Sequence, residues 1–233
     1  RYEKTLEMSS RTLTEYVLYR QIIINKLKQI KPENSEADIH SLIVPMKKKL
    51  EKSNFMSDLY SNNAWLLDDK YMTYSTILSD KDMSELIDVI TEGEEKSQDD
   101  SRPDIALVFS GNPQAKQKVD VVIIELKKKG LKLAKNEEVI SQLRQRRLMK
   151  YYNDKIQRIW FYGIVEFNDE LKISILEDKY NALYSNGSVY YKSIDVMTDL
   201  ATQKTIPAGI YLMDMNSFIN DADIRNSTFL KVI

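Results

Sequence analysis

Two neighbouring runs of β-branched and other apolar residues in the middle of the chain limit its fold most strongly. Residues 102–109 read RPDIALVF and residues 119–127 read VDVVIIELK, with a short polar segment between them. Both runs have the length and composition of buried β-strands. The sequence therefore predicts a central antiparallel hairpin that is covered on both faces.

The register of this hairpin follows from its loop. If Ser110 faces Val119, every pair has the same index sum, and Asp104 falls opposite Glu125. Directly opposed residues share one face of a sheet, with Cβ atoms about 5 Å apart. Lys127 follows Glu125 by two positions and therefore lies on the same face. We predict two carboxylates and one ammonium group at the end of the hairpin, with their tips gathered around one cavity.

The remaining hairpin residues divide between two apolar faces. One face would carry Ile105, Leu107, Phe109, Val122, Ile124 and Leu126, and the face of the charged residues would carry Ala106, Val108, Val121 and Ile123. A buried charge needs an ionic partner or a metal ion. A charged group at the end of such a strand pair therefore predicts a chemical role.

Composition limits what that role is. The chain has no cysteine and a single histidine, His40, so thiol nucleophiles, thiolate zinc sites and zinc sites with several histidines are excluded. A Ser-His-Asp site is a poor choice for the same reason. Carboxylates, lysines and a hard cation remain, and Mg²⁺ with its oxygen ligands fits them, with Mn²⁺ as a substitute.

The lack of cysteine and the length of the apolar runs also predict where the protein is located and which partners it has. The lack of cysteine is typical of a reducing cytoplasm, and no apolar run reaches the roughly 18–20 residues that span a bilayer. We therefore expect a cytoplasmic protein without a membrane partner. The chain begins at Arg1 rather than Met, which is expected both for a fragment of a longer protein and for an engineered start.

The Glu/Asp-x-Lys pattern alone carries little information, because it occurs five times in the chain. Only Glu125–Lys127 ends a long apolar strand and has a Pro-Asp pair opening the preceding strand. The alternative is a charged strand end beside solvent, and we favour the functional interpretation because motif and context agree.

Charge is unevenly distributed although the formal net charge is only −1. Residues 80–100 contain nine acidic and two basic residues, whereas residues 126–150 contain nine basic and two acidic residues. Such runs are usually solvated faces, but a basic face also attracts phosphates. The candidate DNA contacts are Lys128, Lys129, Arg144, Arg146 and Arg147.

Periodicity predicts the other elements. Helices are expected over residues 2–30, from a Ser35 N-cap toward Lys49 with a break at Pro45, over 79–90, over 136–154 with Asn136 as its cap, and at the C-terminus through Phe229. Extended structure is expected over residues 64–78, 158–167, 171–178 and 207–214. Asn186–Gly187 predicts a hairpin with a type I′ turn. The fold class is mixed α/β, with helices packed on a central mixed sheet.

The segments RPDIALVF and VVIIELKKKG, followed by a helix that contains SQLRQ, resemble the PD-(D/E)xK nuclease superfamily over roughly residues 36–180. The resemblance implies a restriction-endonuclease-like αβββαβ core and Mg²⁺-dependent cleavage of DNA. It implies metal ligation by Asp104 and Glu125 and catalysis by Lys127. Gln142 matches a glutamine of some members, which carry Tyr where this chain has Arg146.

The same resemblance suggests a further glutamate from the first core helix, for which Glu36 is the candidate metal ligand. A second resemblance rests on NAWLLDDKYMTYSTILSDK, RPDIALVF and NDADIRNSTF. These segments are similar to the C-terminal region of large bacterial proteins that begin with a histidine-kinase-type ATPase domain. Some of those ATPase–nuclease proteins act in anti-phage defence, which implies an ATPase domain in the same full-length chain.

We predict an N-terminal helical extension over residues 1–34 and a nuclease-like domain over residues 35–233. The predicted function is that of a metal-dependent DNA endonuclease. One alternative is a catalytically inactive nuclease fold that binds nucleic acid or protein. A second alternative is an interaction module in which residues 1–30 form a homo-oligomerisation helix.

Overall fold

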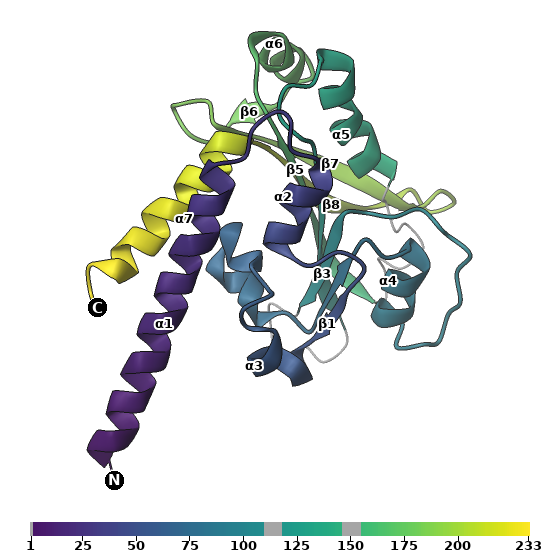
Figure 1. Ribbon diagram of the computed structural model, residues 1–233. Helices are drawn as coiled ribbons and strands as arrows, with labels where there is room; N and C mark the ends of the chain where they lie inside the picture. The colour runs from purple at the N-terminus through teal and green to yellow at the C-terminus, as the bar shows by residue number, and fades with distance from the viewer. Residues whose placement is uncertain (1, 110–117, 146–154) are drawn as a thin grey trace.

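One eight-stranded sheet runs through the part of the chain that the computed structural model describes, residues 2–109, 118–145 and 155–233 (Figure 1). The strands are β1 (Lys49–Glu51), β2 (Thr76–Ser79), β3 (Ile105–Phe109), β4 (Val119–Leu126), β5 (Ile156–Val165), β6 (Asn181–Ala182), β7 (Val189–Asp199) and β8 (Lys204–Asp214). The described α-helices are α1 (Tyr2–Lys28), α2 (Glu36–Ile43), α3 (Phe55–Asp58), α4 (Met83–Ile90), α5 (Leu133–Gln145), α6 (Asp169–Glu177) and α7 (Met215–Leu230). Three 3₁₀ helices are η1 (Lys52–Asn54), η2 (Ala64–Leu66) and η3 (Asp69–Thr73).

The sheet is mixed. Its strand order is β1-β2-β3-β4-β5-β8-β7-β6, and only β5 is parallel to its neighbours, β4 and β8. Helix α5 lies between β4 and β5 in the chain, as a parallel connection requires. The outermost strands are short, because β1 has three residues and β6 has two. A register irregularity interrupts the β7–β8 ladder between Met197 and Asp199.

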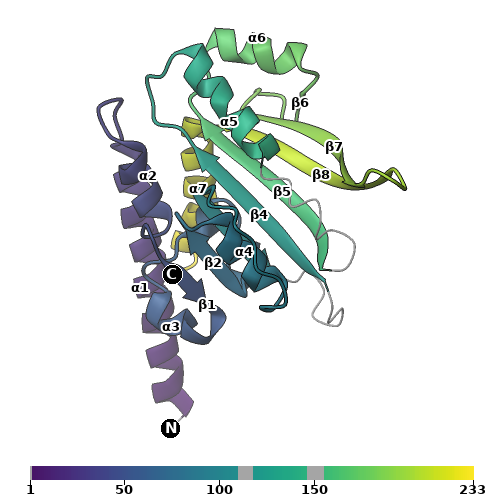
Figure 2. The same ribbon diagram turned by 90° about the vertical axis from the view of Figure 1, so that its right-hand side faces the viewer.

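Helices cover both faces of the sheet (Figure 2). On one face, apolar residues of α1, α2 and α7 pack on Ile105, Leu107, Val122 and Ile124. On the other face, apolar residues of α4, α5 and α6 pack on Ala106, Val108, Val121 and Ile123. Each central strand therefore contributes alternate residues to two separate clusters, which confirms the predicted division of the hairpin and the mixed α/β class.

The second half of α1 belongs to the first of these clusters. Ile24 and Leu27 are fully buried there, whereas Leu6 and Leu13 in the first half are half exposed. The first half projects beyond the rest of the described chain (Figure 1). The predicted division at residue 34 stays a prediction. No helix in the described ranges is long and apolar enough to cross a membrane.

Several predicted elements agree with the structure. Ser35 caps α2 in a capping box with Asp38, and α2 ends at Ile43, before Pro45. Helices α4 and α7 and strands β5 and β8 also lie where the periodicity places them. The hairpin loop and residues 146–154 of the predicted α5 helix lie outside the described residues.

Other predictions are wrong for identifiable reasons. Residues 171–178 lie mostly in a helix, because Asn168 caps α6 and only Leu171 and Ile175, one turn apart, are buried. Ile173, which an alternating strand would bury, is 58% exposed. Asn136 is not a cap. It lies inside α5, is buried, and its side-chain amide donates to the Leu131 carbonyl.

Two further corrections concern turns. Residues 64–73 form mainly η2 and η3 rather than extended structure, and the Asp68 side chain caps η3 by accepting from the Lys70 amide. The β6–β7 hairpin exists, but its loop spans residues 183–188 and only Gly187 of the predicted pair has a positive φ. The turn is therefore not the two-residue type I′ form.

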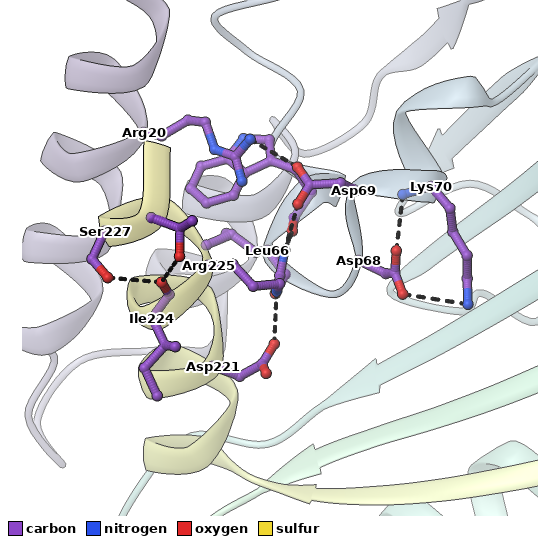
Figure 3. A network of polar contacts seen from close by, with 11 residues as sticks. Arg20, Leu66, Asp68, Asp69, Lys70, Asp221, Ile224, Arg225 and Ser227 are labelled. Carbon is purple, nitrogen blue, oxygen red and sulfur yellow. Dashed lines mark hydrogen bonds and ion pairs between the residues drawn. The ribbon is translucent and has the colours of Figure 1, made fainter. Parts of the chain in front are cut away.

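The Asp69 carboxylate of η3 joins α1 to α7, and Arg225 of α7 extends this network to η2 (Figure 3). Asp69 Oδ1 pairs with Arg20 Nη1 at 2.8 Å, and Asp69 Oδ2 pairs with Arg225 Nη1 at 3.0 Å. The Arg225 guanidinium also donates to the Trp65 and Leu66 carbonyls, each at 2.8 Å. The Arg20 side chain is only 5% exposed, with its guanidinium 4.1 Å from the Trp65 ring centroid. This network ties the two ends of the chain to the segment that precedes β2.

We expect Asp69→Ala to lower the free energy of unfolding by about 2 kcal/mol. The change leaves the buried Arg20 without its carboxylate, and Arg225 retains only its carbonyls and Asp221. The value lies below that of a fully buried pair because Asp69 itself is 42% exposed. Urea denaturation followed by circular dichroism measures the change.

The matched control is Glu51→Ala, which removes the carboxylate of an exposed ion pair with Lys49. That change should cost less than about 0.5 kcal/mol, because exposed pairs contribute little. Equal effects of the two substitutions would contradict a special role for Asp69.

Candidate active site

The β3–β4 pairing places the predicted charged residues together. Ile105 pairs with Ile124 and Phe109 with Asp120, so the index sum is the predicted one throughout the described ladder. Asp104 directly precedes β3, and continuation of the register sets it opposite Glu125. Its carboxylate Oδ2 accepts from the Leu126 amide at 2.6 Å. The Asp104 side chain is therefore held against the end of β4.

Glu125 and Lys127 are both buried, at 2% and 7% exposure. Glu125 is paired with Gly163 of β5, and the Lys127 amide donates to the Ile164 carbonyl at 2.9 Å, which extends the parallel ladder by one residue. Period-two alternation puts Glu125 and Lys127 on the face of Val121. Two ionisable side chains thus follow the apolar run Val121–Ile124 at the end of β4, as the sequence predicts.

Helix α2 adds Glu36 to this group. Its Oε2 lies 3.9 Å from Lys127 Nζ and accepts from the Lys128 amide at 3.3 Å. The capping box of Ser35 starts α2 at Glu36 and so points the first turn at the strand end. Among the site residues that the sequence predicts outside the hairpin, Glu36 is thus the one whose side chain contacts Lys127.

A shallow pocket of about 400 Å³ opens beside this contact. Its lining residues are Ser35, Glu36, Lys127, Lys128, Leu131, Lys135 and Glu138. Lys127 therefore reaches the pocket, whereas Asp104 and Glu125 are not among the lining residues. Of the three side chains that the sequence predicts around one cavity, only Lys127 lines this pocket.

Helix α5 packs closely where β5 has a glycine. A Cβ atom on Gly163 would lie 2.9 Å from a Leu212 methyl and 3.0 Å from a Val139 methyl. The absence of a side chain at this position, next to Glu125 in the sheet, lets α5 approach. Gln142 of α5 is partly buried, and its Oε1 accepts no hydrogen bond from any described residue.

The candidate DNA contacts are dispersed. Arg144 Nη2 pairs with Asp178 Oδ2 at 2.8 Å, and Lys129 Nζ donates to Asn216 Oδ1 at 2.9 Å. Lys128 lines the pocket beside Glu36. Arg146 and Arg147 lie outside the described residues. A phosphate at Arg144 would compete with the Asp178 carboxylate.

The described residues form no metal site with three protein ligands. Within residues 2–109, 118–145 and 155–233, no three His, Asp or Glu side chains gather closely enough to hold an ion. Asp104 and Glu125 offer two carboxylates. The Glu36 carboxylate instead contacts Lys127 Nζ and the Lys128 amide. Mg²⁺ commonly binds through one or two carboxylates and several waters, so the two fit its requirements.

His40 links α2 to the end of β2. It lies one turn after Glu36 in α2, is buried, and its Nε2 is 2.8 Å from Ser79 Oγ. The next residue, Asp80, donates its amide to the Asp104 carbonyl at 2.8 Å. Helix α2 is thereby connected to the backbone of Asp104. The sequence gives no signal for the Ser79 contact, because it depends on tertiary packing.

Stability should depend on pH through His40. Burial lowers the pKa of His40 below its ordinary value, and the Asp80 carboxylate opposes that shift. The unfolded chain then binds the proton more readily, so the stability from neutral His40 is present above about pH 6.5 and is lost as the pH falls toward the folded pKa. We expect the free energy of unfolding to fall by at most about 1.4 kcal/mol per pH unit in that range.

Urea denaturation at a series of pH values tests this expectation. The comparison variant is His40→Gln, which removes the only imidazole of the chain while keeping hydrogen-bonding groups near Ser79. Its pH profile should be flatter than that of the wild type between pH 7 and 5. Parallel profiles would show that His40 titrates alike in the folded and unfolded states.

Comparison with known proteins identifies no relative: no family model, no curated protein and no solved structure matches the chain.

Proposed function

We propose that the chain is a metal-dependent DNA endonuclease domain of the PD-(D/E)xK type. The observation that carries the proposal is the β3–β4 register from Ile105–Ile124 to Phe109–Asp120, because its continuation by one pair would oppose Asp104 to Glu125, with Lys127 two positions further on. Elements α2, β2, β3, β4, α5 and β5 follow one another in the αβββαβ order that the resemblance implies, with β1, α3, the 3₁₀ helices and α4 inserted between α2 and β3.

Asp104 and Glu125 would hold the ion. When bound, Mg²⁺ would polarise a phosphoryl oxygen and acidify a water molecule. The Leu126 amide fixes one Asp104 oxygen, so the carboxylate keeps its orientation without the ion. Glu125 is held by a strand whose neighbours on both sides are buried, which limits its movement.

Lys127 would stabilise the negative charge that develops on the phosphoryl group. Lys127 lines the pocket although its side chain is only 9% exposed, and Glu36 Oε2, 3.9 Å from Nζ, orients it. In this proposal Glu36 positions Lys127, in addition to the metal ligation that the resemblance implies. The two roles differ in consequence, because a positioning carboxylate need not contact the ion.

A nuclease fold without catalysis is the second candidate. The observation that favours it is the lack of a preformed three-ligand group among the described residues. Only the first candidate cleaves DNA, so cleavage of a supercoiled plasmid with Mg²⁺ or Mn²⁺ separates it from the second, which binds nucleic acid or protein.

Glu125→Gln and Lys127→Ala should separate ligand from catalyst. The first change keeps the side-chain volume but removes the negative charge that a hard cation requires, so metal affinity and plasmid nicking should fall together. The second should leave metal affinity within a few-fold and reduce the nicking rate by about 10²–10³-fold. Calorimetric titration with Mn²⁺ and a nicking assay measure the two effects.

Glu95→Gln, in the segment between α4 and β3, is the matched control and should alter neither quantity. Full nicking activity in Lys127→Ala, or unchanged metal affinity in Glu125→Gln, would defeat the assignment. Cleavage that is lost in neither variant would place catalysis elsewhere in the chain.

The basic run is tested separately. Changing Arg144 and Arg147 to Glu should weaken DNA binding and flatten its dependence on salt concentration, because phosphate contacts release counterions. Arg11→Glu, on an exposed face of α1, provides the control. Binding that the double variant leaves unchanged, with the fold retained, would assign the run to a solvated face.

A further inference from the structure

A second pocket lies on the opposite face of the sheet from Glu125. It has a volume of about 750 Å³, within the range of small-molecule sites. Residues of η3, β5, β8, α7 and the 183–188 loop surround it. Figure 3 shows two of its sides, with Asp68 and Lys70 on one and Asp221 and Ile224 of α7 on the other.

Tyrosines form one part of the wall. Tyr162 and Tyr211 are cross-strand neighbours whose rings stack with centroids 5.0 Å apart and 13° between planes. Tyr184, in the 183–188 loop, is 57% exposed and so presents its ring to solvent at the pocket. The stacked pair holds the wall rigid, and Tyr184 offers a free aromatic surface.

The hydroxyl groups of Tyr162 and Tyr211 remain protonated. Burial raises the pKa of Tyr162 and of Tyr211, and the nearby Tyr184 phenol adds to both shifts. Tyr162 Oη is also 2.7 Å from Tyr71 Oη. The phenols are therefore neutral groups at physiological pH, each able to donate and to accept a hydrogen bond.

The charged groups of the wall neutralise one another. Lys70 Nζ lies 3.4 Å from Asp68 Oδ2, and Arg225 Nε lies 2.9 Å from Asp221 Oδ2. An anionic ligand would have to displace one of these carboxylates. Amide and hydroxyl groups complete the polar part of the wall, from Asn186, Ser188, Ser217 and Asn220.

Exposed apolar side chains line the pocket as well. Leu183 is 47% exposed and Ile224 is 68% exposed. Such residues gain stability when a ligand removes them from water. The pocket thus combines an aromatic surface, an apolar margin and neutral hydrogen-bonding groups. Its two cations, Lys70 and Arg225, are each paired with a carboxylate.

We propose that this pocket binds an uncharged planar nitrogen heterocycle that carries hydroxyl groups, of which a nucleoside is the simplest representative. The base would pack against Tyr184 and the apolar margin. Asn220 presents a donor and an acceptor suited to the edge of a base, and Asn186 adds its Nδ2 donor, because its Oδ1 already accepts from Ser188. The carboxylates of Asp68 and Asp221 suit sugar hydroxyls, which can donate without adding charge.

The experiment uses the whole chain and four probes: adenosine, guanosine, cytidine and thymidine. Calorimetric titration should detect at least one of them with a dissociation constant below about 1 mM. The 5′-monophosphate of the same nucleoside should bind no more tightly, because the cations are already paired. Tyr184→Ala should weaken binding by about tenfold, and its exposed position leaves the fold intact.

Tyr60→Ala removes a half-exposed tyrosine that does not line the pocket and should leave nucleoside affinity unchanged. Asn220→Ala is a second pocket variant, on an exposed residue of α7, and should also weaken binding. Absence of binding by all four nucleosides at about 1 mM would overturn the proposal. So would affinity that Tyr184→Ala and Asn220→Ala leave unchanged, or tighter binding of the monophosphate. The proposal does not depend on nuclease activity, and Glu125→Gln should retain nucleoside binding.

Discussion

The pairing of β3 with β4 is the constraint on which the rest of the structure depends. Five residue pairs with one index sum fix which side chains face each helical layer. A shift of β4 by one residue would turn Glu125 and Lys127 toward the cluster of α1, α2 and α7. It would also turn the apolar residues of each β4 face to the opposite face. Burial of both faces therefore sets the register and, through it, the position of the charged residues.

Much of this arrangement could be predicted because it is local. The apolar runs around Ile105 and Ile124 define two strands, and a short loop leaves one register that buries both faces. The capping box of Ser35 is equally local. The strand prediction for residues 171–178 is wrong because Leu171, Ile173 and Ile175 alternate in sequence as in a strand, whereas Leu171 and Ile175 also fit one face of a helix. Packing against α5 and the sheet, which the sequence alone does not describe, decides between the two.

Contacts between distant segments were beyond sequence reasoning. The Asp69 carboxylate joins residues about 50 and 156 positions away, at Arg20 and Arg225. Similarly, His40 meets Ser79 only because α2 lies beside the end of β2. The family resemblance names Glu36 as a candidate metal ligand, but its contact with Lys127 follows from tertiary packing, since a glutamate on a helix surface carries no signal of its own. Local patterns thus define the strand end, and tertiary packing defines what surrounds it.

The short outer strands have a consequence for behaviour in concentrated solution. An exposed strand edge offers unpaired backbone groups to which another chain can add. Here β1 offers only three residues, and β6 covers just two residues of β7. The rest of β7 is protected differently, by Asp195 and Asp199 along the strand and by the ladder irregularity near Met197. The sheet therefore ends on both sides in edges that are poor templates for growth into aggregates.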